Sequence, residues 1–255
     1  NYLFRQVPPK GKRQSLLFSA TLSQAVMRLA WRYMVDPVEI SVAPEQIAHE
    51  NITQSLYHVS SREKLPLLLG LMQKETPHRA MLFVNMKRTG EELCWRLNQN
   101  GYQAVYISGD ISQKKRQRII EALKKGQIDF LVATDVASRG IHCDDVSHVF
   151  NWDIPIDPED YVHRIGRTAR AGATGKAITL ACEDYVMGLP AVEKYIGDKI
   201  PVEHIDDTLM GTDRSGYFRR RRGSTYCGWP LGADTSGQDG FDVGPDAGRE
   251  DRGGD

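Results

Sequence analysis

Apolar runs of strand length alternate with amphipathic stretches of helical length through the middle of the chain. Each apolar run is rich in aliphatic and aromatic side chains and is bounded by turn or charged residues. This alternation is typical of a parallel sheet whose crossover helices cover both faces. We therefore predict an α/β domain whose strands lie at residues 53–59, 80–84, 103–107, 129–133, 146–150 and 176–181.

Capping residues mark the helices that we expect between these strands. Ser112 and Asp157 are good N-caps for two of them. A capping box at Ser60 and Glu63 indicates another start, although Pro66 would disturb the early turns of that helix. The expected helices cover residues 62–75, 87–99, 113–125 and the stretch that begins at 158.

The two ends of the chain differ from this central domain, for which we expect residues 46–210. Residues 1–45 hold one apolar strand at 15–18 and one helix at about 23–34, which is too little to close a sheet. We expect them to be the end of a preceding domain and take the chain to be a fragment of a longer protein. Residues 211–255 contain 11 of the 23 glycines and almost no aliphatic residues, so we expect a disordered tail.

Charge and composition exclude several classes of protein. The 33 Lys+Arg balance the 33 Asp+Glu, so the net charge would not attract the protein to nucleic acid. A site for a polyanion must therefore come from a local cluster of cations, such as the basic run Arg219–Arg222. No apolar run of membrane-spanning length occurs and the polar N-terminus is no secretory signal, so we expect a cytoplasmic protein without a membrane partner. The four cysteines form no CxxC pair, and we expect reduced thiols.

Candidate binding residues follow the ends of the predicted strands, where sheets of this kind bind their ligands. Thr134 and Asp135 open a turn of small residues that allows a phosphate to approach the backbone closely. Gln113 and Arg116 lie one turn apart near the start of a helix. Cations there oppose the helix dipole, so their placement favours a bound anion such as a backbone phosphate.

The stretch from Tyr161 to Gly172 gives the strongest local signal. Arg164, Arg167 and Arg170 recur every three residues, and such an array of guanidinium groups on one side suits a polyphosphate. The chain contains no GxxxxGK[ST] loop to hold a triphosphate. These arginines must therefore complete a site that another part builds.

A second candidate site is a metal cluster formed by His142, Cys143, Asp144, Asp145 and His148. Its spacing argues against a metal, because His142 falls in a turn, His148 falls in the next strand, and no second ligand pair accompanies them. We therefore assign no metal site to the chain itself.

Five short motifs occur in the order seen in DEAD-box RNA helicases, and the chain resembles this family from residue 15 to about 210. The resemblance implies a RecA-like second helicase domain preceded by the remnant of a first RecA-like domain. Within the family, the chain most resembles the RhlB-type helicases of the RNA degradosome. This likeness is based on the His of RGIH, on residues 180–210 and on PEQ at 44–46. The five motifs are SAT at 19–21, LFVN at 82–85, Gln113 to Arg116, ATDVASRG at 133–140 and YVHRIGRTARAG at 161–172.

This resemblance implies an ATP-dependent RNA helicase that unwinds duplexes, in RNA degradation, with ATP and Mg²⁺ bound mainly by the missing first domain. The chain alone would then be inactive. The implied partners are RNA, contacted through its backbone without sequence specificity, and an endoribonuclease or degradosome scaffold. Two other hypotheses are a stand-alone RNA-binding or adaptor domain without ATPase activity, and a DNA translocase of the same superfamily, which the HRIGRTARAG form disfavours.

The resemblance also implies roles for single residues. Arg170 corresponds to the arginine finger and Arg167 to a second γ-phosphate contact. His142 stands where most members have the Asp that contacts the ribose, which leaves this contact open, and Ala169 stands where Gly is usual. Coupling of hydrolysis to RNA release is implied for Ser19, Thr21, Asp135 and His163, and RNA contacts are implied for Asn85, Gly109, Gln113, Arg116 and Thr134.

Overall fold

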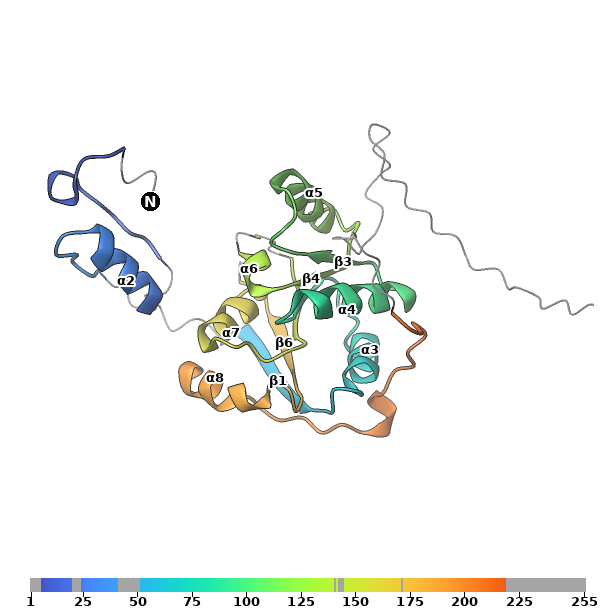
Figure 1. The fold of residues 1–255 in the computed structure, drawn as a ribbon. Coiled ribbons are helices and arrows are strands. Elements are labelled where there is room, and N and C mark those ends of the chain that lie inside the picture. The colour runs from blue at the N-terminus through green and yellow to red at the C-terminus, as the bar shows by residue number, and fades with distance from the viewer. Residues whose placement is uncertain are drawn as a thin grey trace, which may run out of the picture.

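The structure, a computed structural model, describes residues 6–19, 24–40, 51–139, 141, 145–170 and 172–218. Six strands form one sheet in the order β1-β6-β5-β2-β4-β3 (Figure 1), and every neighbouring pair is parallel. The predicted parallel sheet is confirmed, and the strand bounds differ from the predicted ones by at most two residues. The strands are β1 (Ile52–His58), β2 (Ala80–Phe83), β3 (Ala104–Ile107), β4 (Phe130–Ala133), β5 (His148–Asn151) and β6 (Gly175–Ala181).

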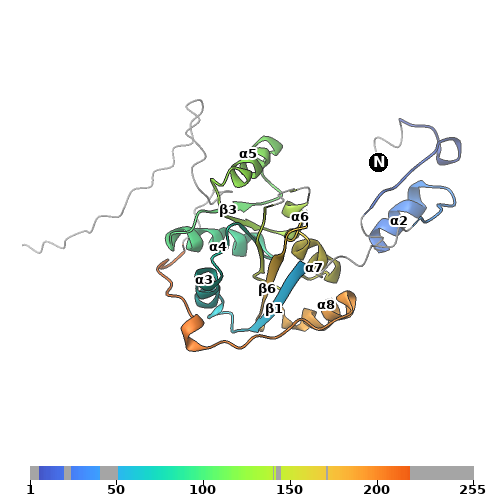
Figure 2. The same ribbon diagram turned by 180° about the vertical axis from the view of Figure 1, so that it is seen from behind.

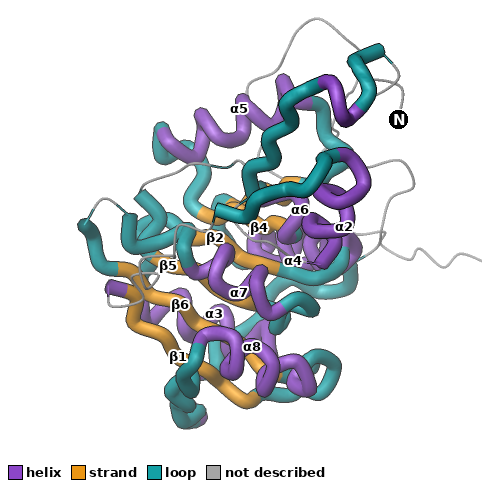
Figure 3. Tube along the Cα trace, turned by 90° about the vertical axis from the view of Figure 1, so that its left-hand side faces the viewer, coloured by secondary structure: helices purple, strands orange, loops and turns teal. Residues whose placement is uncertain are grey.

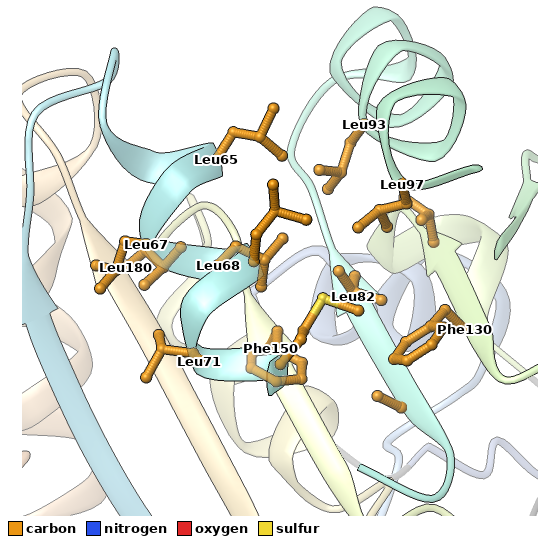
Figure 4. Close-up of a cluster of buried hydrophobic side chains, with 14 of the residues drawn as sticks. Leu65, Leu67, Leu68, Leu71, Leu82, Leu93, Leu97, Phe130, Phe150 and Leu180 are labelled. Atoms are coloured by element: carbon orange, nitrogen blue, oxygen red, sulfur yellow. The ribbon is translucent and has the colours of Figure 1, made fainter. Parts of the chain in front are cut away.

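Helices cover both faces of this sheet. One face packs against α3 (Lys64–Glu75) and α4 (Lys87–Gln99), which lie side by side in Figures 1 and 2. Their leucines meet Leu82, Phe130 and Phe150 of the strands in a single core (Figure 4). The other face packs against α5 (Gln113–Lys124), α6 (Asp135–Ser138), α7 (Pro158–Ile165) and α8 (Leu189–Ile196), of which α7 and α8 are in front of the strands in Figure 3.

The helix starts follow the expected caps with one difference. Ser112 Oγ accepts a hydrogen bond from Lys115 N at 3.4 Å, and the Asp157 side chain caps α7. The helix α3 begins at Lys64, later than predicted, because Ser60 Oγ donates to the Glu63 carboxylate instead of capping the backbone. Pro66 is the third residue of α3, where a missing N–H costs no helical hydrogen bond.

The N-terminal segment contains the expected helix but not the expected strand. The helix α2 spans Gln24–Tyr33, close to the predicted range. Residues 15–18 form no strand, and Leu16 and Phe18 are exposed. A strand exists only when its backbone pairs with a neighbour, and no described segment pairs with these residues. The prediction of a strand at 15–18 was therefore wrong for the described chain.

A C-terminal strap, residues 207–218, crosses α3 and α4. Its backbone approaches α3 so closely that a Cβ atom at Gly70 would lie 1.7 Å from the Leu209 carbonyl oxygen. Asp213 accepts hydrogen bonds from Arg96 of α4 and from Asn100, its C-cap residue, and the ring of Phe218 lies 5.4 Å from that of Trp95. Residues 211–218, which we expected in a disordered tail, are thus fixed by side-chain contacts that composition does not reveal. The run Arg219–Arg222 lies outside the described residues.

The strand order brings the carboxyl ends of β2, β4 and β5 together. After β4, the chain crosses β2 and adds β5 and β6 on its other side. Ligands of open α/β sheets bind where the strand order reverses in this way. The loops that follow these three strands therefore define the candidate site. None of the helices in the described ranges is long and apolar enough to cross a bilayer.

We predict that His148 makes the folded state sensitive to acid. This residue is buried at the start of β5, and burial lowers the pKa of its imidazole below 6.5. The unfolded chain therefore binds a proton more readily, so the free energy of unfolding should fall as the pH drops from about 7.5 to about 5.5. Urea unfolding of His148→Gln across this pH range should show a shallower slope than the wild-type protein. An equal slope in both proteins would contradict the assignment.

Candidate nucleotide and RNA interface

Arg164 occupies the centre of the carboxyl edge. It projects from α7, its side chain is 1% exposed, and it lies over the Phe83 ring. Its Nε and Nη2 atoms donate to the two Asp135 carboxylate oxygens at 2.6 and 2.8 Å. Nη2 also donates to Asn85 Oδ1 at 2.8 Å, and Nη1 donates to the Asp153 carbonyl oxygen at 2.5 Å. One guanidinium group thus joins the loops after β2, β4 and β5.

Asp153 extends these contacts to α3. Its carboxylate accepts a hydrogen bond from Lys64 Nζ at 2.8 Å and another from the Asn85 backbone N–H at 3.0 Å. The side chains of Lys64 and Asp153 are each only 3% exposed. Two cations and two carboxylates therefore compensate each other in the carboxyl-edge network, which consists of Lys64, Asn85, Asp135, Asp153 and Arg164.

The inward direction of Arg164 corrects the expected array of three arginines. The helix α7 ends at Ile165, and Ala169 has a φ of 56°, so a spacing of three residues does not place these side chains on one helical face. Arg164 lies beside Tyr161 and Ile165, whose side chains pack into the core. Of the three arginines, Arg167 and Arg170 are the two whose guanidinium groups are not part of this network.

Arg167 and Arg170 form a half-buried cationic pair. Arg167 Nη1 donates to the Ile141 carbonyl oxygen at 2.9 Å, while its buried Nε has no hydrogen-bond partner among the described residues. Burial, and secondarily the charge of Arg170, lower the pKa of the Arg167 guanidinium. Arg170 Nε donates to the Gly166 carbonyl oxygen at 3.0 Å. An anion placed here would meet two guanidinium groups, which matches a phosphate.

Three of the predicted RNA contacts follow β3, at its end and on α5. Gly109 is exposed directly after β3, and Gln113 is exposed at the first position of α5. Arg116 Nη1 donates to the Arg139 carbonyl oxygen at 3.2 Å, which joins α5 to the segment after α6. A Cβ atom at Gly109 would lie 3.9 Å from Val136 of α6, so the loop after β3 also lies against α6.

The other two predicted RNA contacts follow β4 and β2. Thr134 is half-buried at the N-terminus of α6, and its side chain makes no capping hydrogen bond. Asn85 belongs to the carboxyl-edge network, where its side chain accepts from Arg164 and donates to the Ile154 carbonyl oxygen. The five predicted RNA residues therefore lie on consecutive loops of one edge, although Asn85 also has a structural role.

The predicted coupling residues are only partly brought together. Asp135 pairs with Arg164, whereas His163 Nδ1 lies 3.8 Å from Asp160 Oδ1. A hydrogen bond with His163 contributes most to the lowered pKa of the Asp160 carboxyl. Ser19 is exposed, and Thr21 lies outside the described residues.

The candidate metal cluster is only partly covered by the structure. His142, Cys143 and Asp144 lie outside the described residues. Among the residues that are described, no group of three His, Cys, Asp or Glu side chains is arranged to hold a metal ion. His148 instead lies at the opposite end of the sheet from the network, with Nδ1 2.9 Å from Ser147 Oγ.

Sequence reasoning missed Lys64 and Asp153. Lys64 is the only cation at the start of a leucine-rich helix, and Asp153 follows a buried strand by two residues. Both signals are weak, because isolated charges next to apolar runs commonly face solvent. Their burial becomes evident only when α3 packs beside the end of β5.

Comparison with known proteins gives consistent matches. The family model "Helicase conserved C-terminal domain" matches residues 63–172. ATP-dependent RNA helicase RhlB of Shewanella baltica is 47% identical over 212 residues, which are 83% of this chain and 48% of that protein. The E. coli DEAD-box protein SrmB, solved bound to regulator of ribonuclease activity A, is 39% identical with a TM-score of 0.59, and the match covers 66% of this chain and 98% of that one.

The chain belongs to the DEAD-box RNA helicase family. Another member, S. cerevisiae Dbp5 L327V, solved with RNA and ADP BeF3, matches with 30% identity, a TM-score of 0.69 and coverage of 81% of this chain and 55% of that one. These matches identify the sheet as the RecA-like fold of a DEAD-box protein. The chain spans about half the length of the curated DEAD-box relatives that it matches.

We predict that Arg164→Met strongly destabilises this DEAD-box domain. The change leaves Asp135 and the Asp153 carbonyl without their buried donors, and breaking a buried pair in this way typically costs about 3–5 kcal/mol. Urea unfolding should show that loss relative to the wild type. Arg88→Met, which removes an exposed cation from α4, should cost less than about 1 kcal/mol. Equal stability of both variants would show that the network is not essential for folding.

Proposed function

We propose that this chain supplies the second RecA-like domain of an ATP-dependent RNA helicase that unwinds RNA duplexes. The observation that carries the proposal is the arrangement along one sheet edge. Thr134 and the segment of Arg167 and Arg170 adjoin the buried network, and the loop of Gly109 lies against α6 beside it. A nucleotide and an RNA strand could then be contacted by one rigid unit. The helicase relatives support this reading.

Arg167 and Arg170 are the proposed contacts to the γ-phosphate of ATP. ATP supplies the phosphoryl group, and Mg²⁺ would be held mainly by a first RecA-like domain. An anion at this position is supported by Arg167 Nε, which is buried and has no partner among the described residues, and by the nearby charge of Arg170. Charge that develops on the transferring group would be stabilised by both guanidinium groups, with Arg170 as the finger. His142 remains the candidate for a ribose contact.

RNA would be contacted through its phosphates and riboses. Gln113 and Arg116 offer an amide and a guanidinium from one face of α5. Thr134 offers a hydroxyl group that makes no capping hydrogen bond to α6. Gly109 lets the backbone approach a phosphate, and Asn85 borders the same edge. Such contacts do not read bases, so binding without sequence preference is expected.

Hydrolysis would be coupled to RNA release through the carboxyl edge. Asp135 is held by Arg164 and directly follows Thr134, one of the proposed RNA contacts. His163 lies on the same helix as Arg164. In the closed enzyme, Ser19 and Thr21 would join Asp135 and His163 in this role.

A place in RNA degradation, with an endoribonuclease or a degradosome scaffold as partner, rests on the likeness to RhlB. The related SrmB chain was solved with a regulator of ribonuclease activity, which supports a protein partner for such a domain. A stand-alone RNA-binding or adaptor domain is the second candidate, since the network and the RNA loops would serve it equally well. ATPase activity in a protein that includes a preceding domain separates the two.

We predict that the 255-residue chain binds single-stranded RNA but does not hydrolyse ATP, because it contains neither GxxxxGK[ST] nor a DEAD box. Filter binding should show weakened affinity in Arg116→Ala, and the slope of log affinity against log salt should become shallower by about 0.7. Lys194→Ala on α8 is the matched control and should not change either value. ATP turnover above a buffer blank, or an unchanged affinity in Arg116→Ala, would contradict the proposal.

We predict that Arg170→Lys, in a protein that includes the preceding domain, lowers ATP turnover by roughly 10³- to 10⁵-fold. Lysine carries the charge but cannot contact two phosphate oxygens with a planar fork. RNA binding without nucleotide should change little. Steady-state ATPase beside a thermal melt decides the point. A variant that melts normally and keeps more than about a tenth of the turnover, a loss below about 1.4 kcal/mol, would refute the finger role.

A further inference from the structure

A pocket of about 320 Å³ lies between α3 and α4, outside the residues assigned above to ATP and RNA. Leu65 of α3 and Leu93 of α4 form its apolar base, and Figure 4 shows both side chains between the two helices. The remaining lining residues are Ser61, Arg62, Pro66, Thr89, Glu92, Arg96, Trp152 and Asp213.

Part of the pocket lining lies at the same carboxyl edge of the sheet as the proposed RNA contacts. Arg62 lies in the turn between β1 and α3, Thr89 lies in the first turn of α4, and Trp152 directly follows β5. Thr89 comes four residues after Asn85, which is one of the proposed RNA contacts. At the other end, Asp213 of the C-terminal strap closes the pocket through its ion pair with Arg96.

Two lining residues, Trp152 and Arg62, could contact a ligand in the pocket. Lys64 Nζ, which is not part of the lining, lies 4.7 Å from the centre of the Trp152 ring and is buried. Trp152 itself is half-buried and is one of the lining residues. Arg62 is exposed, and no described acceptor lies within hydrogen-bonding or ion-pair distance of its guanidinium group, whereas Arg96 is neutralised by Glu92 and Asp213.

We propose that this pocket is an additional nucleotide subsite for single-stranded RNA, an inference that rests on the proposed function. The base of one nucleotide packs against Trp152, and its phosphate pairs with Arg62. Base stacking on aromatic rings and pairing with cations are the two interactions by which proteins hold single strands without reading sequence. The volume suits one small planar group.

RNA fits this pocket better than a docked protein segment does. Protein-docking surfaces expose contiguous apolar side chains. In the described part of residues 51–218, the most exposed large aliphatic side chains are Ile156 and Met187, which follow β5 and β6 and do not line this pocket. The pocket instead combines a polar rim, one aromatic ring and the cation of Arg62, for which the described part of the chain shows no partner.

The test measures binding of the 255-residue chain to a ten-nucleotide uridine oligomer and to the same backbone without bases. Trp152→Leu should weaken binding of the uridine oligomer roughly 5- to 150-fold, the range for one base–aromatic stack, and should leave binding of the abasic backbone unchanged. Trp152→Phe, which keeps an aromatic ring, should retain most of the affinity, and thermal melts show whether each variant folds.

Arg62→Gln tests the phosphate contact. Its binding to both oligomers should weaken, and the salt slope should become shallower by about 0.7, whereas the matched Lys194→Gln should behave as wild type. Cross-linking with 5-iodouridine should label Trp152.

Two outcomes separate the failure of this subsite from failure of the proposed function. If Trp152→Leu and Arg62→Gln bind as wild type, and cross-links fall only between Gly109 and Arg116, the subsite is refuted while RNA binding stands. If the wild-type chain binds no RNA, the proposed function itself is refuted.

Discussion

The bidentate pairing of Arg164 with Asp135 is the interaction on which the rest of the site depends. A guanidinium group buried to 1% exposure needs hydrogen-bond acceptors, and those of Arg164 come from the segments after β2, β4 and β5. This requirement fixes where those three loops can lie. The strand order makes it feasible, because β2 is hydrogen-bonded to both β4 and β5.

Buried ion pairs are expensive to desolvate, so this network contributes less to stability than its contacts suggest. Its value lies in the geometry that it imposes. Asn85 and Thr134 belong to loops that the network orders, and Arg167 follows Arg164 by three residues. The network thereby fixes the positions of the residues that we propose for RNA and for the γ-phosphate relative to one another. The proposed nucleotide subsite at Trp152 adjoins the same network through Lys64.

The sequence predicted elements whose signals are local and missed contacts that depend on tertiary packing. Strand runs and the caps at Ser112 and Asp157 are encoded within a few residues, and the structure contains them. The inward turn of Arg164 was not predictable from its spacing, because a repeat of three identifies one face only while a helix continues. Lys64 and the contacts of Asp213 depend on partners 89 residues and over a hundred residues away, which no local pattern reveals.

Hydrogen–deuterium exchange on Arg164→Lys tests most directly whether one side chain organises the carboxyl edge. Lysine keeps the charge but loses the planar fork, so the loops after β2, β4 and β5 should loosen together. Exchange should become faster at the Asn85 amide, which donates to Asp153, and at the Ser138 amide, which donates to the Thr134 carbonyl oxygen, with little change at the amino ends of the strands. Faster exchange confined to α7 would contradict this role of Arg164.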